Sequence, residues 1–222
     1  MHVHDAIKTR KSVRSFSKKK VSLKIIKTVL EISAKSPSGS NTQPWNVHIL
    51  TGKTLNSFKK SSKKHFLKNS KNLKLERLNY MQKYRDPYLS RRRKVGWDLY
   101  NILNIKKGDY ENTQLFHAKN YEFFGAPVGL IFSIEKDLGW MSWLDYGMFL
   151  QNITLACRGF GLHTCAQAAW GLIHQKVNSF LKLDNNFTVH CGMAIGYENT
   201  KDKINSLVTE RAKVREFCKI LK

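Results

Sequence analysis

The clearest pattern of apolar and polar positions lies near the end of the chain. From Phe187 to Ile195 every second residue is a large apolar one or a cysteine, and the run stops at Gly196. This period of two predicts a β-strand with one buried face. Shorter apolar runs bounded by turn residues predict further strands at 45–51, 127–134 and 164–168.

Apolar residues at intervals of three or four predict helices between these strands. After a short opening helix, Ser22 is placed to cap the next helix, which Pro37 and Gly39 then stop. Helices are expected over 23–35, 142–158 and around 177–181, with a less regular one at 54–75.

Two segments complete the predicted organisation of one domain over 1–222. Residues 76–108 follow neither period cleanly, so we interpret them as an inserted lid or subdomain. At the end of the chain, Val214, Phe217 and Leu221 share one face of a predicted helix. Such a face often packs against a partner, so residues 205–222 are expected to form a dimerisation arm.

The composition indicates a folded chain with a sizeable core. Of 222 residues, 41% are hydrophobic and 11% aromatic. No apolar run approaches the ~18 residues that span a bilayer, and the first residues lack the apolar stretch of a secretory signal. We therefore expect a cytoplasmic address and no membrane partner.

The cysteines and histidines do not suggest a metal site. Cys157, Cys165, Cys191 and Cys218 are far apart and form no C-x-x-C pair. His163 and Cys165 form a single close pair with no second half to complete a ligand set. The cysteines are expected to be free thiols, most of them buried.

The net charge is +23, from 39 Lys and Arg against 16 Asp and Glu. Such an excess can bind nucleic acid by neutralising phosphates. Here, however, the lysines are spread along the whole chain, and the two denser clusters, at 59–74 and 91–94, accompany no recognised nucleic-acid-binding motif. We therefore interpret most of the charge as a solvated surface that can steer anionic ligands, and expect no nucleic-acid partner.

Three short segments carry candidate chemistry. Arg10, Lys11, Ser12 and Arg14 set cations around a hydroxyl group, which suits a phosphate because guanidinium groups bind it through charge-assisted, often bidentate bonds. Small and amide-bearing residues at 36–45 can offer N–H and carboxamide groups to a flat heteroaromatic ring. The third segment is G-L-H-T-C-A-Q-A-A-W at 161–170. Taken alone, the first two also fit ordinary polar turns.

These segments occur in the order found in the nitroreductase family. R-K-S-V-R comes first, P-S-G-S-N-T-Q-P-W follows in the first helix-to-strand loop, and G-L-H-T-C-A-Q-A-A-W and A-I-G-Y come later. The chain most closely resembles the nitrobenzoate reductase-like branch, through Y-R-D-P-Y-L-S-R-R-R-K-V-G-W-D-L-Y. The resemblance covers nearly the whole sequence. It implies an α+β fold with a mostly antiparallel sheet flanked by helices, in an intertwined homodimer with FMN at the subunit interface.

The family's cofactor-binding positions carry over to this sequence by the matching motifs. The family more often has proline where this chain has Ala166, so that loop is expected to be less rigid. At the phosphate end or the pyrimidine edge of FMN, the resemblance implies Arg10, Lys11, Ser12, Arg14, Gly196, Lys203 and Arg211. Around the ring it implies Pro37, Ser38, Gly39, Asn41 and Gln43 from the partner subunit, and Cys165, Ala166, Gln167 and Ala168 along the other edge.

The insertion at 76–108 combines aromatic and cationic residues. A lid built from it could stack an aromatic ring and pair with an anionic substituent of the substrate. The alternative is that the tyrosines pack within the protein and the cations are solvated. The candidates are Tyr84, Tyr88, Arg91 and Arg92, with Tyr80, Arg85, Arg93 and Lys94 beside them.

The resemblance further implies a ping-pong oxidoreductase. FMN would accept hydride at N5 from NADH or NADPH and return it to a small nitroaromatic or quinone-like acceptor, so no catalytic side chain is expected. Arg14 would stabilise the reduced ring, and a backbone N–H near Gln167 or Ala168 would bond N5. The alternatives are a flavin dehalogenase or a flavin-fragmenting enzyme of the same fold, and a non-enzymatic nucleic-acid-binding protein supported by charge alone.

Overall fold

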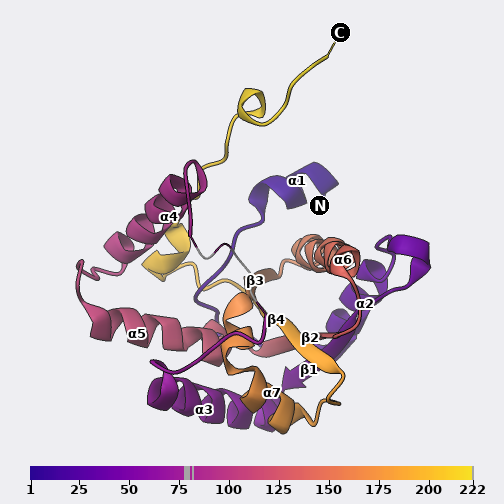
Figure 1. Cartoon of the computed structure of the whole chain (residues 1–222), viewed down its shortest axis with the longest axis horizontal. Helices are drawn as coiled ribbons and strands as arrows, with labels where there is room; N and C mark the ends of the chain where they lie inside the picture. The colour runs from indigo at the N-terminus through magenta and orange to yellow at the C-terminus, as the bar shows by residue number, and fades with distance from the viewer. Residues whose placement is uncertain (78–80, 82, 222) are drawn as a thin grey trace.

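A four-stranded antiparallel sheet forms the centre of the computed structural model, which describes residues 1–77, 81 and 83–221 (Figure 1). The strands lie in the order β1-β2-β4-β3, so β1 and β3 are the edge strands. Their bounds are Asn46–Thr51 for β1, Val128–Glu135 for β2, His163–Gln167 for β3 and Phe187–Gly196 for β4. All four were predicted from the apolar runs and the alternation, close to these bounds.

The helices also follow the predicted pattern through most of the chain. Ser22 caps α2 as expected, since its hydroxyl accepts a hydrogen bond from the N–H of Lys24 (3.2 Å). The helix expected at 54–75 ends earlier, at Asn69. The α-helices are α1 Val3–Thr9, α2 Leu23–Ser33, α3 Gly52–Asn69, α4 Tyr88–Ile102, α5 Tyr110–Ala118, α6 Trp140–Gly159 and α7 His174–Leu181.

Hydrophobic cores lie on both faces of the sheet. Leu130 and Phe132 of β2 pack with α2 and α6, while Ile131 between them contributes to the core with α3, α5 and α7. In the second core Phe58 stacks on Trp170, with 5.0 Å between ring centroids. Gly192 allows β4 to approach this ring, because a Cβ there would lie 2.3 Å from Trp170 Cδ1. The sheet is thus covered by helices on both sides.

The inserted segment contains a surface helix. None of the described residues of α4 is buried, and the helix lies near η4 (Lys203–Ser206) at one side of the molecule (Figure 1). The sequence pattern did not predict this helix, because only a few of its residues, among them Leu99 and Tyr100, pack against the core and its apolar stripe is correspondingly short. Tyr80 of the candidate lid lies outside the described residues.

The prediction of a final helix is wrong. The C-terminal segment forms only a short 3-10 turn, Val214–Glu216, and then runs away from the body of the protein (Figure 1). Val214, Phe217 and Leu221 are 66%, 71% and 93% exposed. A short helix is stabilised mainly by packing its apolar face. No described residue covers the apolar side chains of this segment, so nothing in the chain stabilises a helix there. None of the helices described here is long and apolar enough to cross a membrane.

Candidate functional site

The opening cationic segment, residues 10–14, lies against the start of β3. The backbone N–H of Val13 donates to the carbonyl of Thr164 (3.0 Å), and Ser12 forms a parallel bridge with Thr164. β3 is an edge strand, so its outer side is open to this segment. The structure therefore brings two of the three predicted segments together.

Beyond this bridge, the outer edge of β3 is free within the described residues. Backbone groups alternate direction along a strand, so the N–H and C=O of Ala166 point to the same side as those of Thr164. Ala166 is exposed, and among the described residues the strand that pairs with it, β4, lies on the opposite side. Its N–H is a donor that can meet the edge of a planar ligand.

The side chains of Cys165 and Gln167 point into the protein. Burial raises the pKa of the Cys165 thiol to about 11, against a smaller lowering by Arg14. The Gln167 carboxamide donates to the carbonyl of Asn120 (2.7 Å) and accepts from Trp170 Nε1 (3.4 Å). Ala166 and Ala168 remain as candidates for contacts along the ring.

Two further residues predicted at the phosphate end also have contacts within the chain. Lys11 Nζ pairs with Glu198 Oε1 (2.6 Å) and donates to the carbonyl of Asn205 (2.8 Å), so its charge is already compensated. Gly196 is buried, and a Cβ there would lie 2.7 Å from the Cδ of Pro127. Both residues contribute to the packing around the opening segment, and their roles toward a ligand stay predictions.

Like Arg211, three other predicted cations have no ion-pair partner among the described residues. Within the described part of the chain, no carboxylate forms an ion pair with Arg10, Arg14 or Lys203. Arg14 Nη1 donates weakly to the carbonyl of Ser12 (3.3 Å), and Lys203 is exposed at the start of η4. Unpaired cations beside a hydroxyl group have the donor chemistry that a phosphate requires.

The loop at 37–43 lies elsewhere in the chain. The N–H of Gly39 donates to Asp145 Oδ2 (3.1 Å) near the start of α6, whereas Arg158 near the end of α6 contacts Thr9 and His163. With a rise of about 1.5 Å per residue, these two points are about 20 Å apart along the helix axis. One chain therefore does not bring this loop to the cationic segment.

The loop nevertheless has a defined conformation. Ser40, Asn41 and Gln43 all have positive φ angles, which non-glycine residues rarely adopt. The hydroxyl of Ser38 accepts from the N–H of Gln43 (3.0 Å), and the Gln43 carboxamide donates to the carbonyl of Asn41 (3.2 Å). Pro37, Gly39, Asn41 and Gln43 are exposed, so their polar groups are available to another molecule.

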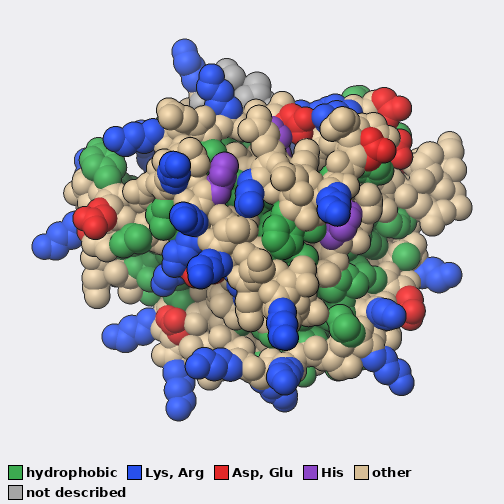
Figure 2. Space-filling model, turned by 90° about the horizontal axis from the view of Figure 1, so that it is seen from below, with side chains coloured by type: hydrophobic (Ala, Val, Ile, Leu, Met, Phe, Trp, Pro, Cys, Tyr) green, Lys and Arg blue, Asp and Glu red, His purple; other side chains and the backbone are tan. Residues whose placement is uncertain are grey.

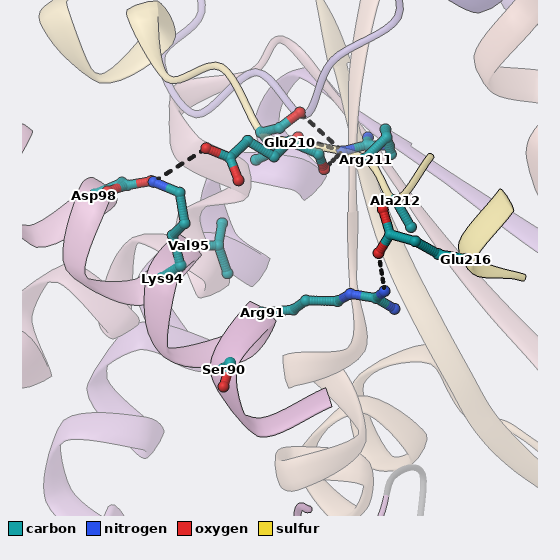
Figure 3. A pocket seen from close by; sticks show the side chains of 10 residues that line it. Ser90, Arg91, Lys94, Val95, Asp98, Glu210, Arg211, Ala212 and Glu216 are labelled. Atoms are coloured by element: carbon teal, nitrogen blue, oxygen red, sulfur yellow. Dashed lines mark hydrogen bonds and ion pairs between the residues drawn. The ribbon is translucent and has the colours of Figure 1, made fainter. Parts of the chain in front are cut away.

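Arg211 lines a cavity of about 350 Å³ between α4 and the C-terminal segment (Figure 3). Its guanidinium donates to the hydroxyl of Thr209 (2.7 Å) and to the carbonyl of Glu210 (2.8 Å), and it is not placed with Arg10 and Arg14 by any contact. Across the cavity, Arg91 pairs with Glu216 and Lys94 with Glu210, both at 3.5 Å. The acidic residues of the tail thus compensate two lid cations.

The other lid candidates are partly engaged with one another. Arg92 lies over the ring of Tyr84, with 4.8 Å between the guanidinium carbon and the ring centroid. Tyr88 is 49% exposed at the start of α4. An aromatic ring with a cation over it, beside a free tyrosine, has the chemistry to bind an aromatic anion.

His163 contributes position and not charge. Burial, and next the Arg158 guanidinium, lower the pKa of His163 to about 4 despite the opposing effect of Glu198. A neutral imidazole can accept a hydrogen bond from Arg158, whose Nη1 is 2.8 Å from Nε2. Sequence reasoning did not single out Glu198 or Asn205, because these residues have no local motif and reach the opening segment from far along the chain.

The remaining charge is distributed over the surface. Figure 2 shows Lys and Arg side chains scattered over one whole face and not gathered in a single patch. On this face the distribution agrees with a solvated surface. No group of three potential metal ligands occurs among the residues that the structure describes.

Comparisons with known proteins identify the class to which this fold and site belong. The model of the Nitroreductase family matches residues 7–197, so the chain belongs to this family. It is 36% identical over 214 residues to the 4-nitrobenzoate reductase of Pseudomonas putida, covering 95% of this chain and 92% of that protein. It is 31% identical to the chloronitrobenzene nitroreductase of Comamonas testosteroni, covering 97% and 95% of the two chains.

A solved structure agrees with the whole architecture. The FMN and NADPH-dependent nitroreductase NfnB from Sphigopyxis sp. strain HMH superposes with a TM-score of 0.96 at 28% identity, and 100% of each chain is covered. The predicted family, α+β fold and oxidoreductase class are confirmed. The residues assigned to the cofactor and to the lid stay predictions.

Proposed function

We propose that this chain binds FMN and reduces nitroaromatic compounds with hydride from NADPH or NADH. The observation that carries the proposal is the junction of the opening segment with β3. There Arg10, Ser12 and Arg14 lie beside an open strand edge, without compensating carboxylates among the described residues. This donor set fits both ends of FMN, its phosphate and the polar edge of its ring.

Each group of this chain has a separate task in the proposal. Arg10, Arg14 and Lys203 bind the phosphate end, and the N–H of Ala166 donates to the ring edge. When bound, FMN supplies the redox chemistry, taking hydride from the nicotinamide and giving it to the acceptor in ping-pong order. The chain orients the two substrates, and solvent can supply protons because the β3 edge is open.

We further infer a homodimer, with each cofactor site completed by the loop at 37–43 of the second copy. Two observations support this inference: the loop is about 20 Å from the cationic segment along α6, and large apolar side chains are exposed on several elements. Exposed apolar patches of this kind are usually covered by a partner. They include Val3 and Ile7 on α1, Trp140 and Leu144 on α6, and Val214, Phe217, Ile220 and Leu221 on the proposed arm at 205–222. Sedimentation that shows a stable flavin-loaded monomer would contradict the inference.

The substrate lid, residues 76–108, is proposed to select aromatic acceptors with an anionic substituent. Its support is the pairing of Arg92 with Tyr84 beside exposed Tyr88. The similarity to a 4-nitrobenzoate reductase over 95% of the chain favours the same substrate class. A cytoplasmic site of action is part of the proposal, since the four cysteines are free.

Purified protein provides a direct test. It should be yellow, absorb near ~450 nm and release FMN on denaturation, and it should oxidise NADPH or NADH in the presence of 4-nitrobenzoate. Arg10→Ala should bind FMN with a dissociation constant roughly ten- to a hundredfold higher than that of the wild type. Lys68→Ala on α3 should bind FMN with the wild-type dissociation constant. Colourless protein that gains no flavin when FMN is added would contradict the proposal.

A further inference from the structure

Asn205 joins the opening segment to η4. It lies two residues after Lys203, and only 5% of it is exposed. Its Oδ1 accepts from the backbone N–H of Arg14 (2.8 Å), and its Nδ2 donates to the carbonyl of Ser15 (2.8 Å). A single carboxamide thus holds two consecutive residues of the chain that carries the candidate phosphate ligands.

The other polar groups of Asn205 are also bonded. Its Nδ2 donates to the carbonyl of Asn199 (3.1 Å), its backbone N–H donates to the carbonyl of Asp202 (3.1 Å), and its own carbonyl accepts from Lys11 Nζ (2.8 Å). Lys11 is fixed in turn by Glu198. A buried polar network in which each member is satisfied is rigid. We call these contacts of Asn205 the Asn205 clasp.

We propose that Asn205 is a positioning residue for phosphate recognition. The Asn205 clasp fixes the spacing between the opening segment, which carries Arg10 and Arg14, and η4, which carries Lys203. Long cationic side chains lose conformational entropy when they bind a ligand. A backbone that is already rigid in the free protein loses no further entropy on binding, so the total cost is smaller. The inference rests on the proposed function, in which the phosphate is that of FMN.

The role of the clasp can be separated from a general effect on folding by comparing FMN with riboflavin, which has the same ring but no phosphate. Asn205→Asp keeps the acceptor for Arg14 but places an oxygen against the carbonyls of Ser15 and Asn199. Asn205→Ala removes the bonds without adding charge. Dissociation constants of both flavins for the apoprotein would be measured by quenching of flavin fluorescence.

Both variants should bind FMN about tenfold or more weakly, with riboflavin changed by no more than about twofold. Val177→Ala is the matched control, because it opens a cavity in the core but removes none of the hydrogen bonds of the clasp. It should lower the thermal stability of the apoprotein and leave the ratio of the two affinities unchanged. An equal loss for both flavins in the Asn205 variants would show a merely structural role and overturn the proposal.

The outcomes also separate this proposal from the proposed function. A wild-type chain that binds neither flavin would overturn both. A wild type that prefers FMN, with the same preference in both Asn205 variants, would overturn the role of the clasp alone. If neither Asn205 variant folds, Glu198→Gln replaces them, because it weakens the contact that fixes Lys11 in the clasp. It should lower the ratio of FMN affinity to riboflavin affinity, by less than about tenfold. An unchanged ratio would overturn the proposal.

Discussion

Protonation of His190 should destabilise the fold below neutral pH. His190 lies on β4, where its ring packs against Trp143 and Tyr146 with 4.8 and 4.7 Å between centroids. Its Nδ1 is buried with no hydrogen-bond partner among the described residues. Burial lowers the pKa of His190 from 6.5 to about 4, because a charged ring would lose its hydration there.

The sign of the effect follows from the two pKa values. Below about pH 6.5 the unfolded chain binds a proton at His190 that the folded chain does not bind until about pH 4. The free energy of unfolding therefore falls as the pH drops through this window. Between about pH 7 and pH 5, the pKa difference gives a loss on the order of 2 kcal/mol from this one residue.

Urea unfolding of the wild type and His190→Phe at both pH values measures this contribution. Phenylalanine keeps a ring between Trp143 and Tyr146 but cannot take up a proton. The fall in the free energy of unfolding from about pH 7 to pH 5 should therefore be smaller in His190→Phe than in the wild type, by about 2 kcal/mol. His4→Gln, at an exposed position on α1, is the matched control and should show the wild-type loss. Equal losses in the wild type and His190→Phe would refute the reasoning.

Three other perturbations probe the packing, the sheet and the lid. Gly192→Ala forces the Trp170 ring to move, since the new Cβ would lie 2.3 Å from it; thermal denaturation should show a loss of about 1–3 kcal/mol, with no loss for Gly147→Ala. Tyr146→Phe leaves the N–H of Asn46 without the hydroxyl that accepts from it at 3.1 Å, so urea unfolding should show a loss of about 1–3 kcal/mol; an unchanged midpoint would contradict this. Nitrobenzoate should have a higher kcat/KM than neutral nitrobenzene, and added salt should narrow the difference; equal values at low salt would remove the role of the lid.

The central fold could be predicted because its strands are apolar enough to be buried, although β2 and β4 are covered on both faces of the sheet and not on the one face that the alternation at 187–195 predicts. The strict alternation at 187–196 and the apolar run at 128–135 both come from strands that lie in the sheet, and Ser22 was identified as a helix cap by local chemistry. The helix α4 was missed because none of its residues is fully buried and its short apolar stripe, Val95, Leu99 and Ile102, is interrupted by charged and polar residues. The spacing of Val214 and Phe217 misled for the opposite reason, since an apolar face predicts a helix only where something covers it.

The candidate site was predictable only where a short segment carries its own chemistry. Arg10 and Arg14 are recognisable in such a segment, and the structure leaves both without an ion-pair partner among the described residues. Lys11 has the same local signature, but Glu198 compensates it from the other end of the chain. Asn205 has no local signature, because its role depends on hydrogen bonds to Arg14 and Ser15. These two residues lie 191 and 190 positions earlier in the chain.

The absence of buried residues in α4 has a consequence for how this enzyme can change. Substitutions at exposed positions away from special contacts usually alter stability by no more than about 0.5 kcal/mol. The exposed positions of α4 can therefore vary while the sheet and its two cores stay intact, whereas Leu99 and Tyr100 pack against one of these cores. If α4 has the proposed role of a substrate lid, substrate preference and fold stability would be encoded by largely separate sets of residues, and a new acceptor could be adopted without a compensating change in the core.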